Sequence, residues 1–283
     1  ESYSVNLSSK PDLFLPSSWG IKLPLLINYS HSLLSPKLIQ GTDILAGEIY
    51  EADRKIQTID DKVTLSTQFS KSTRSRNWFN KYTLDNILLK FSVINGRKST
   101  SIIESEEYFD YEYFGSYNYK FSKDNYINIF SILEKFPLLG NPLSAIRLYY
   151  SPDQVSTSAK LEEYDKINVQ RANLENPTFT YNLNMQREYD IKYKLTNSIV
   201  TRYKRVISSN YDNYKNDKFD IIKDIPSGFS SDSPSDWTID DPGLIKSVSE
   251  TFTNSYSPNY FKWLSPKVTY NPTYKWTLVN AGD

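Results

Sequence analysis

Residues 108–122 have the sequence Tyr-Phe-Asp-Tyr-Glu-Tyr-Phe-Gly-Ser-Tyr-Asn-Tyr-Lys-Phe-Ser, and their side chains alternate in character. The odd-numbered positions are aromatic apart from Gly115, whereas the even-numbered positions are mostly polar, with Tyr108 and Phe114 as exceptions. Successive side chains of a β-strand point to opposite faces of its sheet. The stretch therefore predicts a strand with one aromatic face and one polar face in contact with water.

The same two-residue period recurs along the chain, clearly at 177–186, 187–196 and 267–278. Further candidate strands are 21–33, 62–72, 81–94, 126–133, 144–162, 198–207 and 244–256. Turn-forming residues separate many of these stretches: Asn95-Gly96 predicts a hairpin turn, and Lys123-Asp-Asn125 predicts a short turn. The sequence therefore predicts an all-β fold of antiparallel strands.

Two stretches break the alternation. Segment 35–60, with Gly41 and Gly47, is expected to be an irregular insertion, and 208–243 is expected to be a long polar loop. Pro24 and Pro272 lie inside otherwise good strands and predict edges, bulges or breaks there. No internal repeat is visible beyond strand–turn–strand, so residues 1–283 are treated as a single β-rich segment.

The length of the alternating stretches bears on their environment. Several run about ten residues or longer, whereas strands of soluble proteins peak near five or six. A membrane-spanning β-strand needs roughly 9–11 residues, and Tyr and Trp collect where a barrel meets lipid headgroups. The strands are thus expected to form part of the wall of a large transmembrane β-barrel, with a soluble sandwich or propeller as the alternative. The side chains predicted to face lipid are Phe109, Tyr111, Tyr113, Tyr117, Tyr119, Phe121, Tyr189, Ile191, Tyr193, Leu195, Tyr270, Tyr274 and Trp276.

Composition excludes several classes of function. Lys plus Arg is 33 and Asp plus Glu is 33, so the net charge of zero argues against a dedicated nucleic-acid binder. The chain has no cysteine and one histidine, which excludes thiol chemistry, disulfides, cysteine-based zinc sites and multi-histidine metal centres. Aromatic residues make up 15% of a chain whose mean hydropathy is −0.55, as expected of a sheet with one wet face. No cofactor is predicted.

A search for catalytic or binding residues finds only weak candidates. Adjacent acids occur at Asp60-Asp61, Glu106-Glu107, Glu162-Glu163 and Asp240-Asp241, but neighbours on a strand point to opposite faces. A carbohydrate-active enzyme would require two acids converging in a cleft from distant parts of the chain. The remaining candidates are a Ca²⁺ loop with Asp232, Asp236, Asp240 and Asp241, a phosphate-binding group of Arg202, Lys204 and Arg205, and the lone His31. For each of these, a solvated or structural role is the competing interpretation, and no catalytic or metal site is assigned.

Both ends of the chain alternate like strands, at Glu1–Ser9 and Lys275–Asp283, and this predicts a piece of a longer protein. Neither a signal-peptide pattern nor a run of about 18 apolar residues is present. Any contact with a membrane is therefore expected to be made by strands.

Three blocks carry a resemblance to a known family. They are Leu15-Pro-Ser-Ser-Trp-Gly-Ile-Lys-Leu-Pro-Leu-Leu-Ile-Asn-Tyr-Ser30, Asn77-Trp-Phe-Asn-Lys-Tyr-Thr-Leu-Asp-Asn-Ile-Leu-Leu-Lys-Phe-Ser92 and Tyr260-Phe-Lys-Trp-Leu-Ser-Pro-Lys-Val-Thr-Tyr-Asn-Pro-Thr-Tyr-Lys-Trp276. Together they resemble the SprA/Sov family of giant outer-membrane proteins of type IX secretion and gliding motility. Arg187–Thr196 resembles another strand of that family. The sequence departs from the family pattern after Ser35, where the family is usually richer in Pro and Asp.

The resemblance implies a translocon and not an enzyme. Such a protein forms one very large barrel in the outer membrane of a Gram-negative-type cell envelope, through which folded cargo leaves the periplasm. This chain would be an internal slice of the wall, and segment 35–60 would be a plug or rim element. The implied partners are membrane lipid, secreted cargo proteins and periplasmic plug or accessory proteins. The alternative from another class is a soluble or surface-attached β-rich module that binds carbohydrate through exposed Tyr and Trp.

Overall fold

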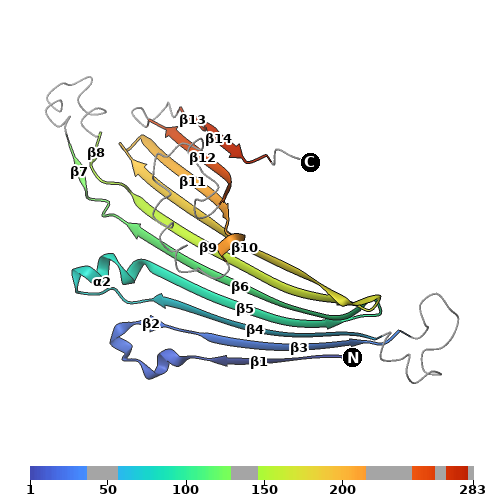
Figure 1. Cartoon of the computed structure of the whole chain (residues 1–283). Coiled ribbons are helices and arrows are strands. Elements are labelled where there is room, and N and C mark those ends of the chain that lie inside the picture. The colour runs from blue at the N-terminus through green and yellow to red at the C-terminus, as the bar shows by residue number, and fades with distance from the viewer. Residues whose placement is uncertain (37–56, 129–145, 215–243, 259–265, 280–283) are drawn as a thin grey trace, which may run out of the picture. The chain divides into compact units, whose positions relative to one another are not determined.

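The computed structural model describes residues 1–36, 57–128, 146–214, 244–258 and 266–279. Long antiparallel β-strands dominate it, which confirms the predicted all-β class (Figure 1). The chain divides into two compact units: unit 1 contains 1–115, 160–185 and 211–216, and unit 2 contains the remainder. The boundary between the units falls inside three strands. Within the described residues, no helix is long and apolar enough to cross a membrane.

Unit 1 is a sheet whose loops carry short helices. Its own elements are β1 (Ser2–Ser9), η1 (Pro11–Phe14), η2 (Ser17–Trp19), β2 (Ile21–Lys22), β3 (Leu25–Leu34), β4 (Thr58–Lys71), α2 (Trp78–Tyr82), η4 (Leu84–Asn86), β5 (Ile87–Ser99) and η6 (Asp212–Tyr214). The strands that also run into unit 2 are β6 (Ile103–Lys120), β9 (Gln154–Gln170) and β10 (Asn173–Lys194).

The strand order in unit 1 is β1-β3-β4-β5-β6-β9-β10, and β2 pairs with β4. The first four strands are antiparallel and in continuous register: Val5 lies opposite Tyr29, Tyr29 opposite Val63, and Val63 opposite Asn95. Among the described residues β1 has a partner strand on one side only, β3, so it is an edge strand. Pro24 falls between β2 and β3, which confirms the predicted break there.

Unit 2 contains the rest of β6, β9 and β10, followed in sheet order by β11 (Ile199–Asn210) and β12 (Leu244–Tyr256). Both β13 (Val268–Tyr270) and β14 (Thr273–Thr277) pair with β12, and β7 (Tyr126–Ile127) pairs with β8 (Leu148–Tyr149). The single strand predicted at 267–278 is therefore two short strands. Pro272 separates them, because proline has no N–H to donate to the ladder, and its carbonyl accepts from Phe252 N instead.

The structure corrects several predicted strand limits. The stretches 177–186 and 187–196 form one strand, β10, and the stretch 81–94 begins with a helical turn, so that β5 starts only at Ile87. Residues 208–210 of the predicted polar loop belong to β11, and β12 begins at Leu244; residues 215–243 lie outside the described residues. Most of the irregular segment 35–60 also lies outside them, while β4 already starts at Thr58. Of 126–133, residues 126–127 form β7 and 129–133 are outside the described part.

The predicted hairpin at Asn95-Gly96 is wrong, because both residues lie inside β5 and the chain turns at 100–102 instead. Gly96 has a packing role and not a turn role. A Cβ atom at this position would clash with Cζ, Cε1 and the hydroxyl oxygen of Tyr108 on β6, so the tyrosine occupies the space that a side chain would need. Glycine in a strand often marks such a close approach.

Replacing Gly96 tests this explanation. We expect Gly96→Ala to lower the free energy of unfolding by about 1–3 kcal/mol, the usual cost of overpacking. Gly115→Ala is the control, because its added Cβ would meet Leu89 Cδ2 at an ordinary 3.5 Å. Denaturant unfolding of the full-length protein measures both variants. In a Tyr108→Ala background Gly96→Ala should cost little, and an equal cost in both backgrounds would contradict the packing role.

Candidate functional site

The sheet of unit 1 has two chemically different faces. Because residues paired in register share a face, the odd-numbered side chains of β1, β3, β4 and β5 lie on one side. The ring centroids of Phe91 and Tyr113 are 5.1 Å apart, which puts the odd positions of β6 up to Gly115 on the same side. We call this side the apolar face, because most of its residues are apolar or aromatic, and the opposite side the polar face.

Aromatic rings follow one another along β6 on the apolar face. The rings of Phe109 and Tyr111 are stacked at 6.1 Å, and those of Tyr111 and Tyr113 at 6.5 Å. Phe109 and Tyr113 are exposed, as are Val5 and Leu7 on β1. No other described element of unit 1 covers the apolar face at these exposed positions.

Ion pairs and short polar side chains are frequent on the polar face, which also carries the aromatic residues Tyr108 and Phe114 of β6. Lys160 Nζ lies 3.2 Å from Glu112 Oε2 and 2.5 Å from Glu162 Oε1, and Lys166 pairs with Glu106 at 3.6 Å. On β1 and β3 the polar face carries serine and asparagine, and Asn28 Nδ2 donates to Asn6 Oδ1. The ion pairs on β6 and β9 therefore place charges of both signs on this face, whereas Lys90 Nζ lies 5.6 Å from the centre of the Phe114 ring.

A row of polar groups crosses the apolar face near one end of its strands. Tyr3, His31, Asp61 and Arg97 lie opposite one another on β1, β3, β4 and β5. His31 Nδ1 is 2.6 Å from Asp61 Oδ1, the Tyr3 and His31 rings are 5.0 Å apart, and Arg97 Nε is 3.5 Å from Glu107 Oε1. We call these five residues the polar row.

An ion pair at the other end of β4 fixes the β4–β5 loop. Lys71 Nζ lies 2.5 Å from Asp85 Oδ1, and the two side chains are 10% and 6% exposed. Ser75 N donates to Asp85 Oδ2 at 2.6 Å, and Ser75 Oγ donates to Asp85 Oδ1 at 2.9 Å. Burial alone would raise the pKa of Asp85, but the bonds from Lys71 and Ser75 outweigh it, so the pKa lies below its usual range.

In unit 2 the same division into faces appears on β10 and β11. Even-numbered residues are ion-paired: Arg202 Nε donates to Asp190 Oδ1 at 2.9 Å, and Lys204 Nζ lies 2.9 Å from Glu188 Oε1. The opposite face holds a buried apolar cluster of Tyr189, Ile207 and Val248, with Ile245 and Trp276 packed against it. The prediction that 188, 190 and 192 lie opposite the aromatic positions of this strand therefore agrees with the partners observed.

The thirteen residues predicted to face lipid differ in exposure. Phe109, Tyr113, Leu195, Tyr270 and Tyr274 are exposed. The half-buried ones are Tyr111, Tyr117, Tyr119, Phe121, Ile191, Tyr193 and Trp276. Tyr189 is 3% exposed and belongs to the core of unit 2, because Ile207 and Val248 pack on it, so its side chain is not on an open surface. For the other twelve, contact with lipid stays a prediction.

The other candidate residues have structural partners where they are described. Arg202, Lys204 and Arg205 each face a carboxylate, so they do not form a free cationic group. Among the adjacent acids, Glu106 pairs with Lys166 and Glu107 with Arg97, on opposite faces of β6. The four aspartates of the Ca²⁺ hypothesis and the pair Asp240-Asp241 lie outside the described residues.

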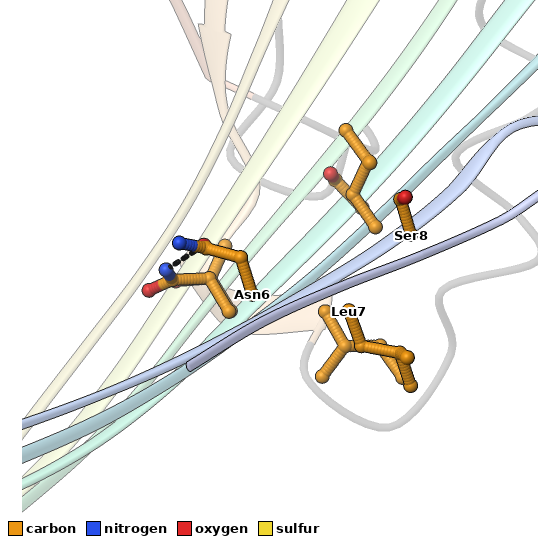
Figure 2. A pocket seen from close by; sticks show the side chains of 8 residues that line it. Asn6, Leu7 and Ser8 are labelled. Atoms are coloured by element: carbon orange, nitrogen blue, oxygen red, sulfur yellow. Dashed lines mark hydrogen bonds between the residues drawn. The ribbon is translucent and has the colours of Figure 1, made fainter. Parts of the chain in front are cut away.

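A surface depression of about 260 Å³ lies over β1, β3 and β4. Figure 2 shows Leu7 on the opposite side of β1 from Asn6 and Ser8, with the Asn6–Asn28 hydrogen bond drawn. The lining residues are Asn6, Leu7, Ser8, Leu26, Ile27, Asn28, Thr64 and Ser66. No aromatic or ionisable side chain lines this depression, so it lacks both the stacking surface and the acids that a sugar site would use.

The polar row and the Lys71–Asp85 pair were not found from the sequence. His31 was singled out there as a lone histidine, but its alignment with Asp61 and Arg97 depends on the strand register. The charged residues of the row interrupt alternating patterns at Asp61, Arg97 and Glu107, and that interruption is the only signal they leave in the sequence.

These features define an all-β protein of long antiparallel strands, whose unit 1 has one apolar and one polar, ion-paired face. No protein-family model matches the sequence, and no curated protein matches it significantly.

Proposed function

We propose that this chain forms part of the wall of a transmembrane β-barrel, with the apolar face of unit 1 against lipid and the polar face toward a water-filled lumen. The observation that carries the proposal is the spacing of ionisable groups on β4. Asp61 and Lys71 stand on the same side of the strand, ten residues apart, and Val63, Leu65, Thr67 and Phe69 lie between them on that side.

The distance between these two residues suits a membrane. Ten residues of a strand span about 33 Å. A strand tilted by about 40° crosses an apolar band roughly 25 Å tall in the same length. The polar row lies at the level of Asp61 on the neighbouring strands, and its member Tyr3 is of the residue type that favours a membrane–water interface. The ion-paired polar face, with both signs of charge, suits the lumen of such a barrel.

The resemblance of three sequence blocks to the SprA/Sov family indicates the kind of barrel that we propose. We propose that the barrel is a protein translocon of the outer membrane, that secreted proteins pass through it, and that periplasmic plug or accessory proteins bind it. In this role the chain forms part of the barrel wall and has no catalytic role. Balanced charge on the lumen side would let cargo proteins of either charge pass without being retained.

Single-cysteine labelling along β5 tests the membrane orientation; residues 1–283 contain no cysteine, and any cysteine elsewhere in the full-length protein would first be replaced by serine. Cysteines at Phe91, Ser92, Val93 and Ile94 of the full-length protein would each carry an environment-sensitive fluorophore in lipid vesicles. We expect quenchers on lipid acyl chains to act at 91 and 93 and a water-soluble quencher to act at 92 and 94, because successive positions face opposite sides. Quenching from water at all four positions, with none from lipid, would contradict the proposal.

The carbohydrate-binding alternative rests on the stacked rings of Phe109, Tyr111 and Tyr113, because exposed aromatic rings can stack on sugars. It makes the opposite prediction for the labelling experiment. A sugar-binding module would show water access at 91 and 93, and oligosaccharides would protect the labels near Tyr113.

A further inference from the structure

Two loops at one end of the unit 1 strands form a single exposed surface. The β1–β2 loop, 10–20, and the β4–β5 loop, 72–86, contact each other: Ser72 N donates to Gly20 O at 2.8 Å, and Thr73 Oγ1 donates to Trp19 O at 3.3 Å (Figure 1). Both follow directly from strands that carry the apolar face. We call residues 10–20 and 72–86 the loop surface.

Large apolar side chains stand out from the loop surface into solvent. The exposed ones are Leu13, Phe14, Trp19, Trp78, Phe79 and Tyr82. Phe14 is 93% exposed and Trp78 is 73% exposed, so nothing in the described protein covers them. Soluble proteins rarely expose so many large apolar side chains in one place unless a partner or a membrane binds there.

The same surface carries positive charge in a chain that is neutral overall. Lys10, Arg74, Arg76 and Lys81 are all exposed, and Lys81 Nζ lies 5.4 Å from the centre of the Tyr82 ring. Asp85 is already paired with Lys71. The two loops contain one further acidic residue, Asp12, and four cationic residues. The surface therefore combines tryptophan and phenylalanine with an excess of lysine and arginine.

We propose that the loop surface lies in the headgroup layer of a bilayer and binds anionic phosphate lipids there. Trp and Tyr prefer the membrane–water interface, and Lys and Arg near it attract anionic headgroups. The position of the loop surface also agrees with a place in the headgroup layer, because the loops begin where the apolar stretch of β4 ends, at Lys71. This inference rests on the proposed function, since only a membrane-spanning sheet brings the loops to that level.

Two labels in the full-length protein separate the inference from the proposed function. A fluorophore on Ser17→Cys reports on the loop surface, because Ser17 is exposed and lies between Phe14 and Trp19. A fluorophore on Leu7→Cys reports on the apolar face. The protein is placed in vesicles of phosphatidylcholine that also contain phosphatidylglycerol as the anionic lipid. We expect headgroup-attached quenchers to act at 17 and mid-chain quenchers to act at 7.

A second measurement tests the preference for anionic lipid. The Ser17 label should be quenched more strongly when the headgroup quencher is carried by phosphatidylglycerol than when phosphatidylcholine carries it. One cation near an anionic bilayer is worth roughly fivefold in association, so Arg74→Gln with Arg76→Gln should lower the ratio several-fold, with the remainder due to Lys10 and Lys81. The control is Lys62→Gln with Lys98→Gln on the polar face, which should leave the ratio unchanged.

The outcomes are distinct. Quenching at 7 without quenching at 17 would overturn the inference and leave the barrel wall intact; the loop surface would then stand clear of the bilayer, as expected if another protein docked on it. Quenching at neither position would overturn the proposed function itself. Equal quenching by the two lipid types at 17 would place the loops at the interface but overturn the binding of anionic lipid.

Discussion

Asp85→Asn is expected to lower the free energy of unfolding by about 3–5 kcal/mol, the usual cost of leaving one partner of a buried ion pair alone. The substitution removes the negative charge that Lys71 Nζ faces at 2.5 Å, in a site where the lysine side chain is only 10% exposed. It also weakens the bonds that hold Ser75. Denaturant unfolding of the full-length protein in detergent or lipid measures the loss.

The pH dependence of stability gives an independent check on the same pair. The pKa of Asp85 is lower in the folded protein than in the unfolded chain. Its contribution to stability is therefore fully present above the unfolded value of about 3.9 and is lost as the pH falls through the folded value. The wild-type protein should lose this stability on acidification, whereas Asp85→Asn should show a flatter profile below about pH 4.

A double-mutant cycle separates the ion pair from general packing. Lys71→Met should cost several kcal/mol in the wild type but much less in the Asp85→Asn background, because the isolated charge is then gone. The more solvent-accessible pair of Lys204 and Glu188, whose side chains are 38% and 35% exposed, serves as the control, and its coupling should stay within about 1 kcal/mol. Additive costs at Lys71 and Asp85 would show that the pair does not act as one.

Side-chain alternation was sufficient to predict which faces are apolar and which are polar, because parity along a strand is a local property. Glu188, Asp190 and Lys192 lie on the polar side of their strand as expected and are ion-paired. The odd positions 109, 111 and 113 form the stacked aromatic row. The break placed between 186 and 187 was wrong for a specific reason. Arg187 falls on the apolar side of β10, but it is buried and its Nη2 donates to Ser209 Oγ at 3.1 Å, so the strand continues through it.

Features that depend on the register between strands could not be predicted from the sequence. Whether His31 meets Asp61 is decided by how β3 and β4 are aligned, and local alternation is the same for any shift of two residues. The role of Gly96 likewise depends on Tyr108, which lies on another strand. The aromatic residues of 77–92 contributed to the family resemblance, but it is the contacts of Ser72 with Gly20 and of Thr73 with Trp19 that join the two loops in one surface.

Introducing arginine at the middle of the apolar face should have the second large effect. Leu65 lies near the midpoint between Asp61 and Lys71 and faces the apolar side, where Ile27 and Val93 are its neighbours in register. Leu65→Arg is expected to destabilise the protein in a bilayer by about 2–4 kcal/mol, the cost of arginine near the midplane on the lipid side of a barrel. Ser66→Arg should cost little, since Ser66 faces the polar side with Ser92.

Arginine at Leu65 would also destabilise the protein if Leu65 lay in the core of a soluble protein. A third variant, at another level along the strands, is therefore needed for the comparison. Leu33 lies on the same face of β3 but beyond the polar row, opposite Ile59. Leu33→Arg should therefore cost only about 0–1 kcal/mol, as expected near a membrane–water interface. In a soluble protein, the cost of arginine would not be expected to follow the depth of the residue in a bilayer. Urea unfolding from vesicles, together with outer-membrane levels and cargo secretion, would be measured for all three variants. Equal tolerance at 65 and 66, or a cost at 33 that matches the cost at 65, would mean that the apolar face does not cross a membrane.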